Sequence, residues 1–272
     1  MSVAGKVVVI TGGTRGIGLA VAEECARSGA RVVVCGVCED RLADAVARIS
    51  NAGSTPAEGI VADVSDFNSV ERLRDFALDR CGRVDVWFNN AGISLGYHPV
   101  DEQPAEDLAR IVSTNLTGHI FGCRVILPYF RERGGYLMNM AGRGYRGEAT
   151  PHTAIYAATK TAIVSLTRSL AAENKGIGNL SINALVPGMV ETDFYRDLSV
   201  SPRLEKTKDN WRFALDAFGV PLETVATEGA RLLGEEPGRR TGEVISLLTT
   251  SRTMRGVAKM AWYSMTGKMV RE

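Results

Sequence analysis

Cysteine is scarce in this sequence. The 272 residues include five cysteines, scattered at positions 25, 35, 38, 81 and 123, which argues against the disulfide framework of a small secreted domain. Cys35 and Cys38 have the C-x-x-C spacing of redox and zinc sites. However, Cys35 ends a β-like run instead of beginning a helix, and no second pair completes a zinc site. We therefore interpret both cysteines as structural residues.

Neither sign of charge dominates, and no long apolar run is present. The 32 basic and 31 acidic residues leave a net charge of +1, whereas a dedicated nucleic-acid binder would show a basic surplus. His98, His119 and His152 have no metal-ligand spacing, so no metal site is predicted. The first residues lack the regions of a secretory signal, and no stretch is long enough to span a membrane. We expect a cytoplasmic protein that binds no nucleic acid.

Short apolar runs alternate with stretches of helical periodicity. Residues 7–10, a run of Val and Ile bounded by glycines, predict a strand buried on both faces. Further strands are expected at 32–35, 59–62, 84–88, 136–140, 180–185 and 242–248, and helices at 17–28, 40–50, 69–80, 105–130 (broken near Gly118 and Gly122) and 154–174. This order predicts an α/β fold with a doubly wound, Rossmann-type parallel sheet of seven strands and helices on both faces. Without a linker or repeat, we expect one domain over residues 1–250.

Two segments depart from this rhythm. Residues 192–220 are polar and follow the sixth strand, so we expect a substrate lid over the carboxyl edge of the sheet. In the tail, 251–272, apolar residues recur at helical spacing among five basic ones: Met254, Val257, Ala258, Ala261, Trp262 and Met265, with Arg252, Arg255, Lys259, Lys268 and Arg271. We favour a basic amphipathic helix docked on the domain or on another subunit. The alternative is a helix that lies on a membrane surface.

A glycine-rich turn joins the first strand to the first helix. Residues 11–18 read Thr-Gly-Gly-Thr-Arg-Gly-Ile-Gly. Glycines allow a tight turn and a close approach to a pyrophosphate, and the helix N-terminus offers free N–H groups to it. The turn predicts a dinucleotide-binding domain, in which the cofactor contacts Gly12, Thr14, Arg15, Gly16, Ile17 and Gly18.

The end of the second strand favours NADP(H) over NAD(H). An acidic residue there would bind the ribose hydroxyls of NAD, but positions 35–37 carry no acid, and Glu39 comes slightly later. Arg15, inside the glycine turn, could reach a 2′-phosphate with its fork of donors.

Five motifs in order resemble the short-chain dehydrogenase/reductase family. They are Thr-Gly-x-x-x-Gly-x-Gly at 11–18, Asn-Asn-Ala-Gly at 89–92, Asn115, Tyr156-x-x-x-Lys160 and Pro187-Gly188. The resemblance covers residues 6–248 and implies a homodimer or homotetramer and an oxidoreductase that interconverts a ketone or aldehyde and an alcohol. It assigns catalysis to Tyr156, Lys160 and Asn115, with Lys160 also holding the nicotinamide ribose. It also assigns the adenine to Asp63 and Val64, the adenosine ribose to Asn90, and the carboxamide to Val190 and Thr192.

The chemistry explains why a tyrosine and a lysine stand four residues apart. Tyr156 and Lys160 share one face of a helix. A phenol, with an ordinary pKa near 10, gives up its proton poorly at neutral pH. A neighbouring ammonium favours the phenolate, so Tyr156 becomes a usable general acid or base.

One position departs from the family. The catalytic serine is replaced by Gly142, in Asn-Met-Ala-Gly at 139–142, which removes a donor to the substrate carbonyl. Three accounts compete: Tyr156 acts alone, a nearby group (Tyr145, Thr150, Thr153 or His152) replaces the serine, or catalysis is lost. We favour retained activity, because Tyr156, Lys160 and Asn115 remain.

The surrounding residues also resemble the chlorophyll b reductase branch of the family, which implies a bulky, apolar substrate. The sequence thus predicts a reductase of such a substrate. The alternatives are an impaired NADP(H)-binding regulatory or scaffold protein and a sugar-nucleotide epimerase or dehydratase. The spacing of the glycines in residues 11–18 counts against the latter.

Overall fold

Seven parallel strands form one sheet in the order β3-β2-β1-β4-β5-β6-β7. The structure is a computed structural model that describes residues 2–192, 199–207 and 210–268. The strands are β1 (Val7–Thr11), β2 (Arg31–Gly36), β3 (Glu58–Val61), β4 (Val86–Asn89), β5 (Gly135–Met140), β6 (Leu180–Val186) and β7 (Val244–Ser246). The predicted doubly wound sheet of seven strands is confirmed, and each predicted strand overlaps an observed one.

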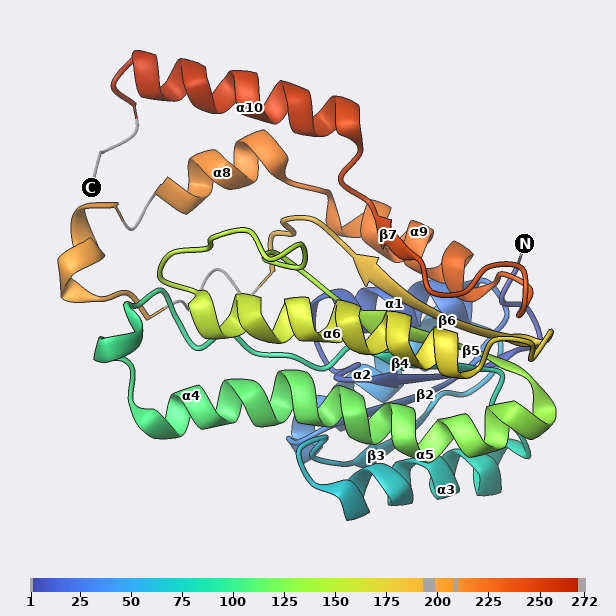
Figure 1. Cartoon of the computed structure of the whole chain (residues 1–272). Helices are drawn as coiled ribbons and strands as arrows, with labels where there is room; N and C mark the ends of the chain where they lie inside the picture. Colours follow the sequence, from blue (N-terminus) through green and yellow to red (C-terminus); the bar gives the residue numbers. More distant parts are fainter. Residues whose placement is uncertain (1, 193–198, 208–209, 269–272) are drawn as a thin grey trace.

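Helices cover both faces of the sheet (Figure 1). They are α1 (Gly16–Arg27), α2 (Glu39–Ala52), α3 (Phe67–Cys81), α4 (Ala105–Val112), α5 (Gly118–Arg133), α6 (Ala154–Glu173), α8 (Asn210–Phe218), α9 (Leu222–Leu233) and α10 (Thr250–Met265). One core cluster packs α1, α2 and α9 against the sheet, and a second packs α3, α5 and α6 against the other face. Because both faces are covered, every residue of β1 is buried, as its apolar sequence predicts.

The strand order reverses between β1 and β4. β1 pairs with β2 on one side and with β4 on the other, so the connections that leave these two strands diverge to opposite faces. In such sheets a crevice opens at the carboxyl ends of the two strands. The fold therefore places the glycine-rich turn after β1 and the Asn-Asn-Ala-Gly segment after β4 side by side.

The α-helix is interrupted just before Gly118, as predicted, but the predicted break near Gly122 is wrong. A π-helical turn, η2 (Ser113–Thr117), joins α4 to α5. Gly122 lies inside α5, where an added Cβ would be 2.0 Å from Asn89 Oδ1. The glycine therefore serves close packing of α5 against β4 and does not end the helix.

The predicted lid contains a 3₁₀ turn, η3 (Pro202–Thr207), and α8, while residues 193–198 and 208–209 of it lie outside the described residues. α10 docks on α8 (Figure 1), where Lys259 Nζ lies 2.8 Å from Asp216 Oδ2 and the Tyr263 hydroxyl donates to the same carboxylate. The predicted tail helix is thus present, although Arg271 lies outside the described residues.

The docked face of α10 is opposite to the predicted one. Gly256 and Tyr263 are buried, whereas Met254, Trp262 and Met265 of the apolar stripe are exposed. Within the described residues, none of the helices is long and apolar enough to cross a membrane.

Candidate active site

A cavity of about 940 Å³ opens at the carboxyl edge of the sheet. It brings together all thirteen residues predicted to contact the cofactor: Gly12, Thr14, Arg15, Gly16, Ile17, Gly18, Asp63, Val64, Asn90, Tyr156, Lys160, Val190 and Thr192. These residues come from loops and helices that are distant in the sequence. Their convergence is what a single dinucleotide site requires, while the role of each remains a prediction.

The glycine turn is shaped for an anion. Gly12 and Gly16 have φ values of +63° and +55°, which residues with a side chain rarely adopt. At Gly18, an added Cβ would lie 2.4 Å from the Gly12 carbonyl oxygen. α1 begins here without a side-chain cap and without an acidic residue in its first turn. Its first N–H groups are therefore available to a phosphate, so the turn fits the pyrophosphate of a nicotinamide dinucleotide.

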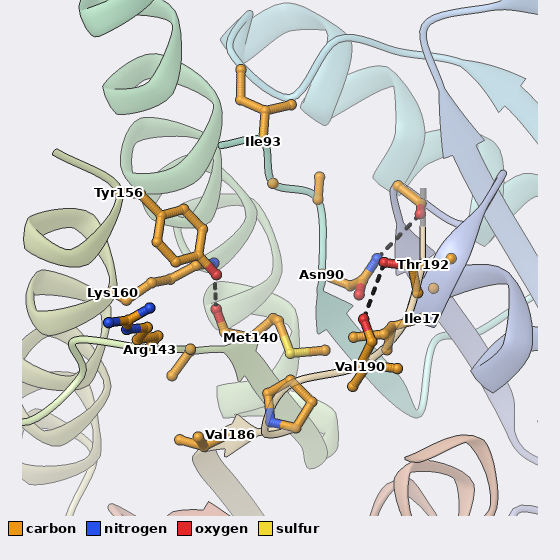
Figure 2. A pocket seen from close by; sticks show the side chains of 18 of the residues that line it. Ile17, Asn90, Ile93, Met140, Arg143, Tyr156, Lys160, Val186, Val190 and Thr192 are labelled. Carbon is orange, nitrogen blue, oxygen red and sulfur yellow. Dashed lines mark hydrogen bonds between the residues drawn. The ribbon is translucent and has the colours of Figure 1, made fainter. Parts of the chain in front are cut away.

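Asn90 ties this turn to the end of β4. Its Nδ2 donates to the carbonyl oxygens of Thr11 (2.9 Å) and Gly12 (3.1 Å), and Thr11 Oγ1 accepts from the backbone N–H of Asn90 (3.0 Å) and Ala91 (3.1 Å). Figure 2 shows the Asn90 side chain directed toward the turn. Asn90 thus fixes the shape of the site, a function that sequence reasoning missed because its partners are backbone atoms of another strand.

Two arginines line the cavity just after β1 and β2. Arg15 was predicted there; Arg41, in the first turn of α2, was not, although a basic residue soon after the second strand is a readable signal. Both line the cavity, whereas Glu39 is not among the lining residues described. Asp63 Oδ1 accepts from Ser65 N (2.9 Å) and Ser65 Oγ (2.7 Å), so this carboxylate also shapes its own loop.

Tyr156 and Lys160 project from α6 into the same cavity (Figure 2). Lys160 Nζ lies 5.4 Å from the centroid of the Tyr156 ring and donates to the Met140 carbonyl oxygen at 3.0 Å. Only 2% of Lys160 is exposed, and burial lowers the pKa of its ammonium to about 7. The ammonium is thus held beside the phenol in a poorly solvated place.

Asn115 is fully buried in the π-helical turn and does not line the cavity itself. Its Oδ1 accepts from Ile93 N (2.8 Å), and its Nδ2 donates to Ile93 O (2.8 Å). Ile93 does line the cavity, so Asn115 holds the loop after β4 in place. The catalytic role that the resemblance assigns to Asn115 remains a prediction.

Gly142 lies directly against Tyr156. A Cβ added at this position would be 2.6 Å from the Tyr156 hydroxyl oxygen, closer than side-chain carbons approach other atoms. Four groups were considered above as substitutes for the serine. Within the described part of the chain, Tyr145 is the one of them that lines the cavity. Thr150, Thr153 and His152 do not line it.

His119 is a buried group that sequence reasoning missed, because histidines were considered there only as metal ligands or as substitutes for the serine. It is 1% exposed in α5, and its Nε2 has no hydrogen-bond partner in the described structure. Burial first, and the Lys160 ammonium second, lower its pKa well below the ordinary value. It is therefore a neutral ring close to the lysine. In the described ranges, no three His, Cys, Asp or Glu side chains gather where they could hold a metal ion.

Residues 6–202 match the model of the short chain dehydrogenase family. The chain belongs to this family, whose members are oxidoreductases that bind nicotinamide cofactors and act on CH–OH or C=O groups. This agrees with the glycine turn, the tyrosine and the lysine that share the cavity.

Three known proteins of different activity are similar to this chain. Chlorophyll(ide) b reductase NOL of Oryza sativa subsp. japonica is 40% identical over 192 residues, 68% of this chain and 56% of the relative, so the chain spans little more than half of that protein. 3beta-hydroxysteroid dehydrogenase 1 of Eggerthella lenta is 31% identical over 89% of this chain and 91% of its own length. The structure of an actinorhodin polyketide ketoreductase with NADPH superposes with a TM-score of 0.76 at 30% identity, over 89% and 95% of the two chains.

Proposed function

We propose that this protein is an NADP(H)-dependent reductase that converts a ketone of a bulky, apolar molecule into an alcohol. The observation that supports it most is the shared cavity, in which Tyr156 and Lys160 face the same space as the glycine turn of residues 11–18. This arrangement lets a substrate carbonyl lie between a hydride donor and a proton donor. The homodimer or homotetramer stays a prediction.

A nicotinamide cofactor held at the glycine turn of residues 11–18 would supply the hydride for the carbonyl carbon. In the proposed reaction Tyr156 gives its hydroxyl proton to the carbonyl oxygen. The Lys160 ammonium stabilises the phenolate that remains. Its hydrogen bond to the Met140 carbonyl holds it at the end of β5, next to the tyrosine ring. Tyr156 then recovers a proton before the next turnover.

The missing serine changes how the carbonyl oxygen is held. Since Gly142 carries no side chain, the Tyr156 hydroxyl can approach the backbone at this position closely. Tyr145, which lines the cavity and stacks on the Arg146 guanidinium at 5.1 Å, is the group we propose as a second donor to the substrate oxygen.

Arg15 and Arg41 support the preference for NADP(H). A 2′-phosphate is dianionic near neutral pH, and two guanidinium groups could bind it with several charge-assisted hydrogen bonds. The lining residues between them, Gly36, Val37 and Cys38, carry no carboxylate that would repel it. The related ketoreductase was solved with NADPH, which agrees with this choice.

The apolar substrate is supported by apolar side chains from the last third of the chain that line the cavity. They are Ala214 and Phe218 of α8, Met260 of α10, and Met189 and Leu248. The names of the relatives point to polycyclic molecules: a chlorophyll(ide), a hydroxysteroid and a polyketide.

The test is the oxidation of NADPH and of NADH with ketones graded from small and polar to polycyclic. We expect turnover with NADPH and large apolar ketones. The Tyr156→Phe variant should lose at least about a hundredfold in turnover rate while it still binds the cofactor. Turnover confined to small polar ketones would contradict the proposed substrate class. A Tyr156→Phe variant that stays active would contradict the assignment of Tyr156 as the proton donor. Tight NADPH binding without turnover would favour a regulatory or scaffold protein, for which Gly142 is the supporting observation.

A further inference from the structure

The outer face of α10 exposes a continuous row of apolar side chains. Met254, Val257, Trp262 and Met265 expose 69, 58, 47 and 79% of their surface. With the exposed alanines 258 and 261 between them, they form what we call the outer stripe. In the described parts of the chain, the other large exposed hydrophobic residues are spread over several separate segments. The outer stripe therefore concentrates apolar surface on a single helix, which marks an interaction site.

One edge of the outer stripe is positively charged. Arg252, Arg255 and Lys259 follow one another at helical spacing beside Trp262, and Lys268 stands just past the end of α10. Lys268 Nζ lies 4.4 Å from the centroid of the Trp262 ring. Residues 244–268 contain no aspartate or glutamate, so α10 carries no carboxylate of its own. Lys259 is paired with Asp216 of α8, so the charge of this edge rests mainly on Arg252, Arg255 and Lys268.

The inner face of the same helix closes the active-site cavity. Thr253 and Met260 line the cavity. Gly256 lies against α8, where an added Cβ would be 2.3 Å from Phe218 Cε1. Figure 1 shows α10 as the outermost helix on this side, above α8. α10 is thus a thin wall between the cavity and the outer stripe.

We propose that the outer stripe lies in the surface of a membrane that contains anionic lipids. An amphipathic helix binds there by inserting its apolar face between the headgroups, and basic side chains along its edge add attraction to anionic lipids. Trp262 sits where the apolar face meets the charged edge, which is the position that an indole ring prefers at a membrane surface.

A second copy of the chain fits this surface less well. In an antiparallel two-fold contact, each outer stripe would pack on its equivalent, and the basic edge of one helix would meet the basic edge of the other. Since residues 244–268 supply no carboxylate, this contact would repel, whereas anionic headgroups supply the opposite charge.

The proposed orientation also gives an apolar substrate a route to the site. With the outer stripe in the headgroup layer, the cavity wall formed by Thr253 and Met260 is one helix thickness from the membrane. This consequence rests on the proposed function, whereas membrane binding itself does not.

The experiment measures partitioning of the full chain onto vesicles of phosphatidylcholine, with and without phosphatidylserine. We expect at least about tenfold stronger binding to the anionic vesicles, since each basic residue near the surface contributes about fivefold. The double variant Val257→Ser/Met265→Ser should lose about tenfold in partitioning, and Arg255→Glu at least about fivefold on anionic vesicles alone. Val100→Ser and Arg133→Glu make the same kinds of change at exposed positions elsewhere and should bind as the unmodified protein does.

Equal binding to both kinds of vesicle, or no binding, would overturn the proposal. So would a concentration-dependent dimer in sedimentation that the double variant abolishes, because a second copy would then cover the outer stripe. NADPH oxidation with a water-soluble ketone, measured without vesicles, tests the proposed function separately. If the protein binds anionic vesicles but reduces no ketone, the membrane proposal is supported and the proposed function is contradicted.

Discussion

The hydroxyl of Tyr156 occupies the space above Gly142 that a side chain at this position would fill. A Cβ added at Gly142 would lie 2.6 Å from the hydroxyl oxygen, so any side chain there must displace the phenol. Gly142 is not in the positive-φ region, so its backbone would accept another residue. The contact with the tyrosine, and not the backbone conformation, therefore explains why this position holds a glycine.

This contact predicts different effects for two substitutions at one position. Gly142→Ala should lower kcat/KM about tenfold, because a displacement of the phenol by a few tenths of an ångström weakens proton transfer. Gly142→Ser displaces the phenol equally but adds a donor to the carbonyl, so it should recover part of the loss. Steady-state kinetics on one ketone compares the two. Unchanged turnover in the alanine variant would show that the contact does not position Tyr156.

A second prediction concerns the choice of cofactor. Arg41→Ser removes one of the two guanidinium groups that we propose for the 2′-phosphate, those of Arg15 and Arg41, and a hydrogen bond between charged groups is worth about 2 kcal/mol. We therefore expect KM for NADPH to rise about thirtyfold while KM for NADH stays within about twofold. Arg48→Ser, on the same helix but paired with Glu23 outside the cavity, serves as the control and should change neither value. A parallel rise for both cofactors would mean that Arg41 does not contact the 2′-phosphate.

The fold and the composition of the site could be predicted because their signals are local. The apolar runs at residues 7–10 and 32–35 are buried on both faces, so their composition alone identifies strands. The glycine turn and the pair on α6 have fixed spacings in the chain. Once the strand order is given, their convergence on one cavity follows.

What could not be predicted depends on contacts between distant segments. The spacing of Met254 and Trp262 shows that they share a face of α10, but not which face α8 covers. Gly256 and Tyr263 settle that question, because a glycine lets Phe218 approach closely and Asp216 accepts from the tyrosine. Similarly, nothing near residue 142 in the sequence shows that Gly142 touches Tyr156.

Asn115 provides a third prediction, on stability. Asn115→Ala removes both hydrogen bonds to the backbone of Ile93 and leaves its N–H and C=O without these partners in a partly buried place, which should lower the free energy of unfolding by about 2 kcal/mol. Urea denaturation measures the change. Ser113→Ala alters a partly exposed residue of the same π-helical turn and should cost less than about 1 kcal/mol. If the two variants were equally stable, the loop after β4 would not depend on Asn115.

Lys160 provides the last prediction, on the pH dependence of stability. Burial lowers the pKa of Lys160 in the folded protein from 10.5 to about 7, so between these pH values the unfolded chain binds more protons than the folded one. Stability from this residue therefore rises with pH across that window and is lowest on the acidic side. Relative to Lys160→Met, which cannot titrate, the protein should gain about 1.5 kcal/mol in unfolding free energy between pH 7 and pH 8.5.

Taking the difference between the two proteins removes the contributions of other groups. The buried thiols of Cys25 and Cys123 have raised pKa values, so above about pH 9 they change stability in the opposite direction, but equally in both proteins. Urea unfolding at four pH values between 7 and 8.5 gives the difference. A constant difference would mean that Lys160 keeps its proton throughout, as an ammonium solvated by water in the cavity. The low-dielectric setting that we invoke for the phenolate of Tyr156 would then be wrong.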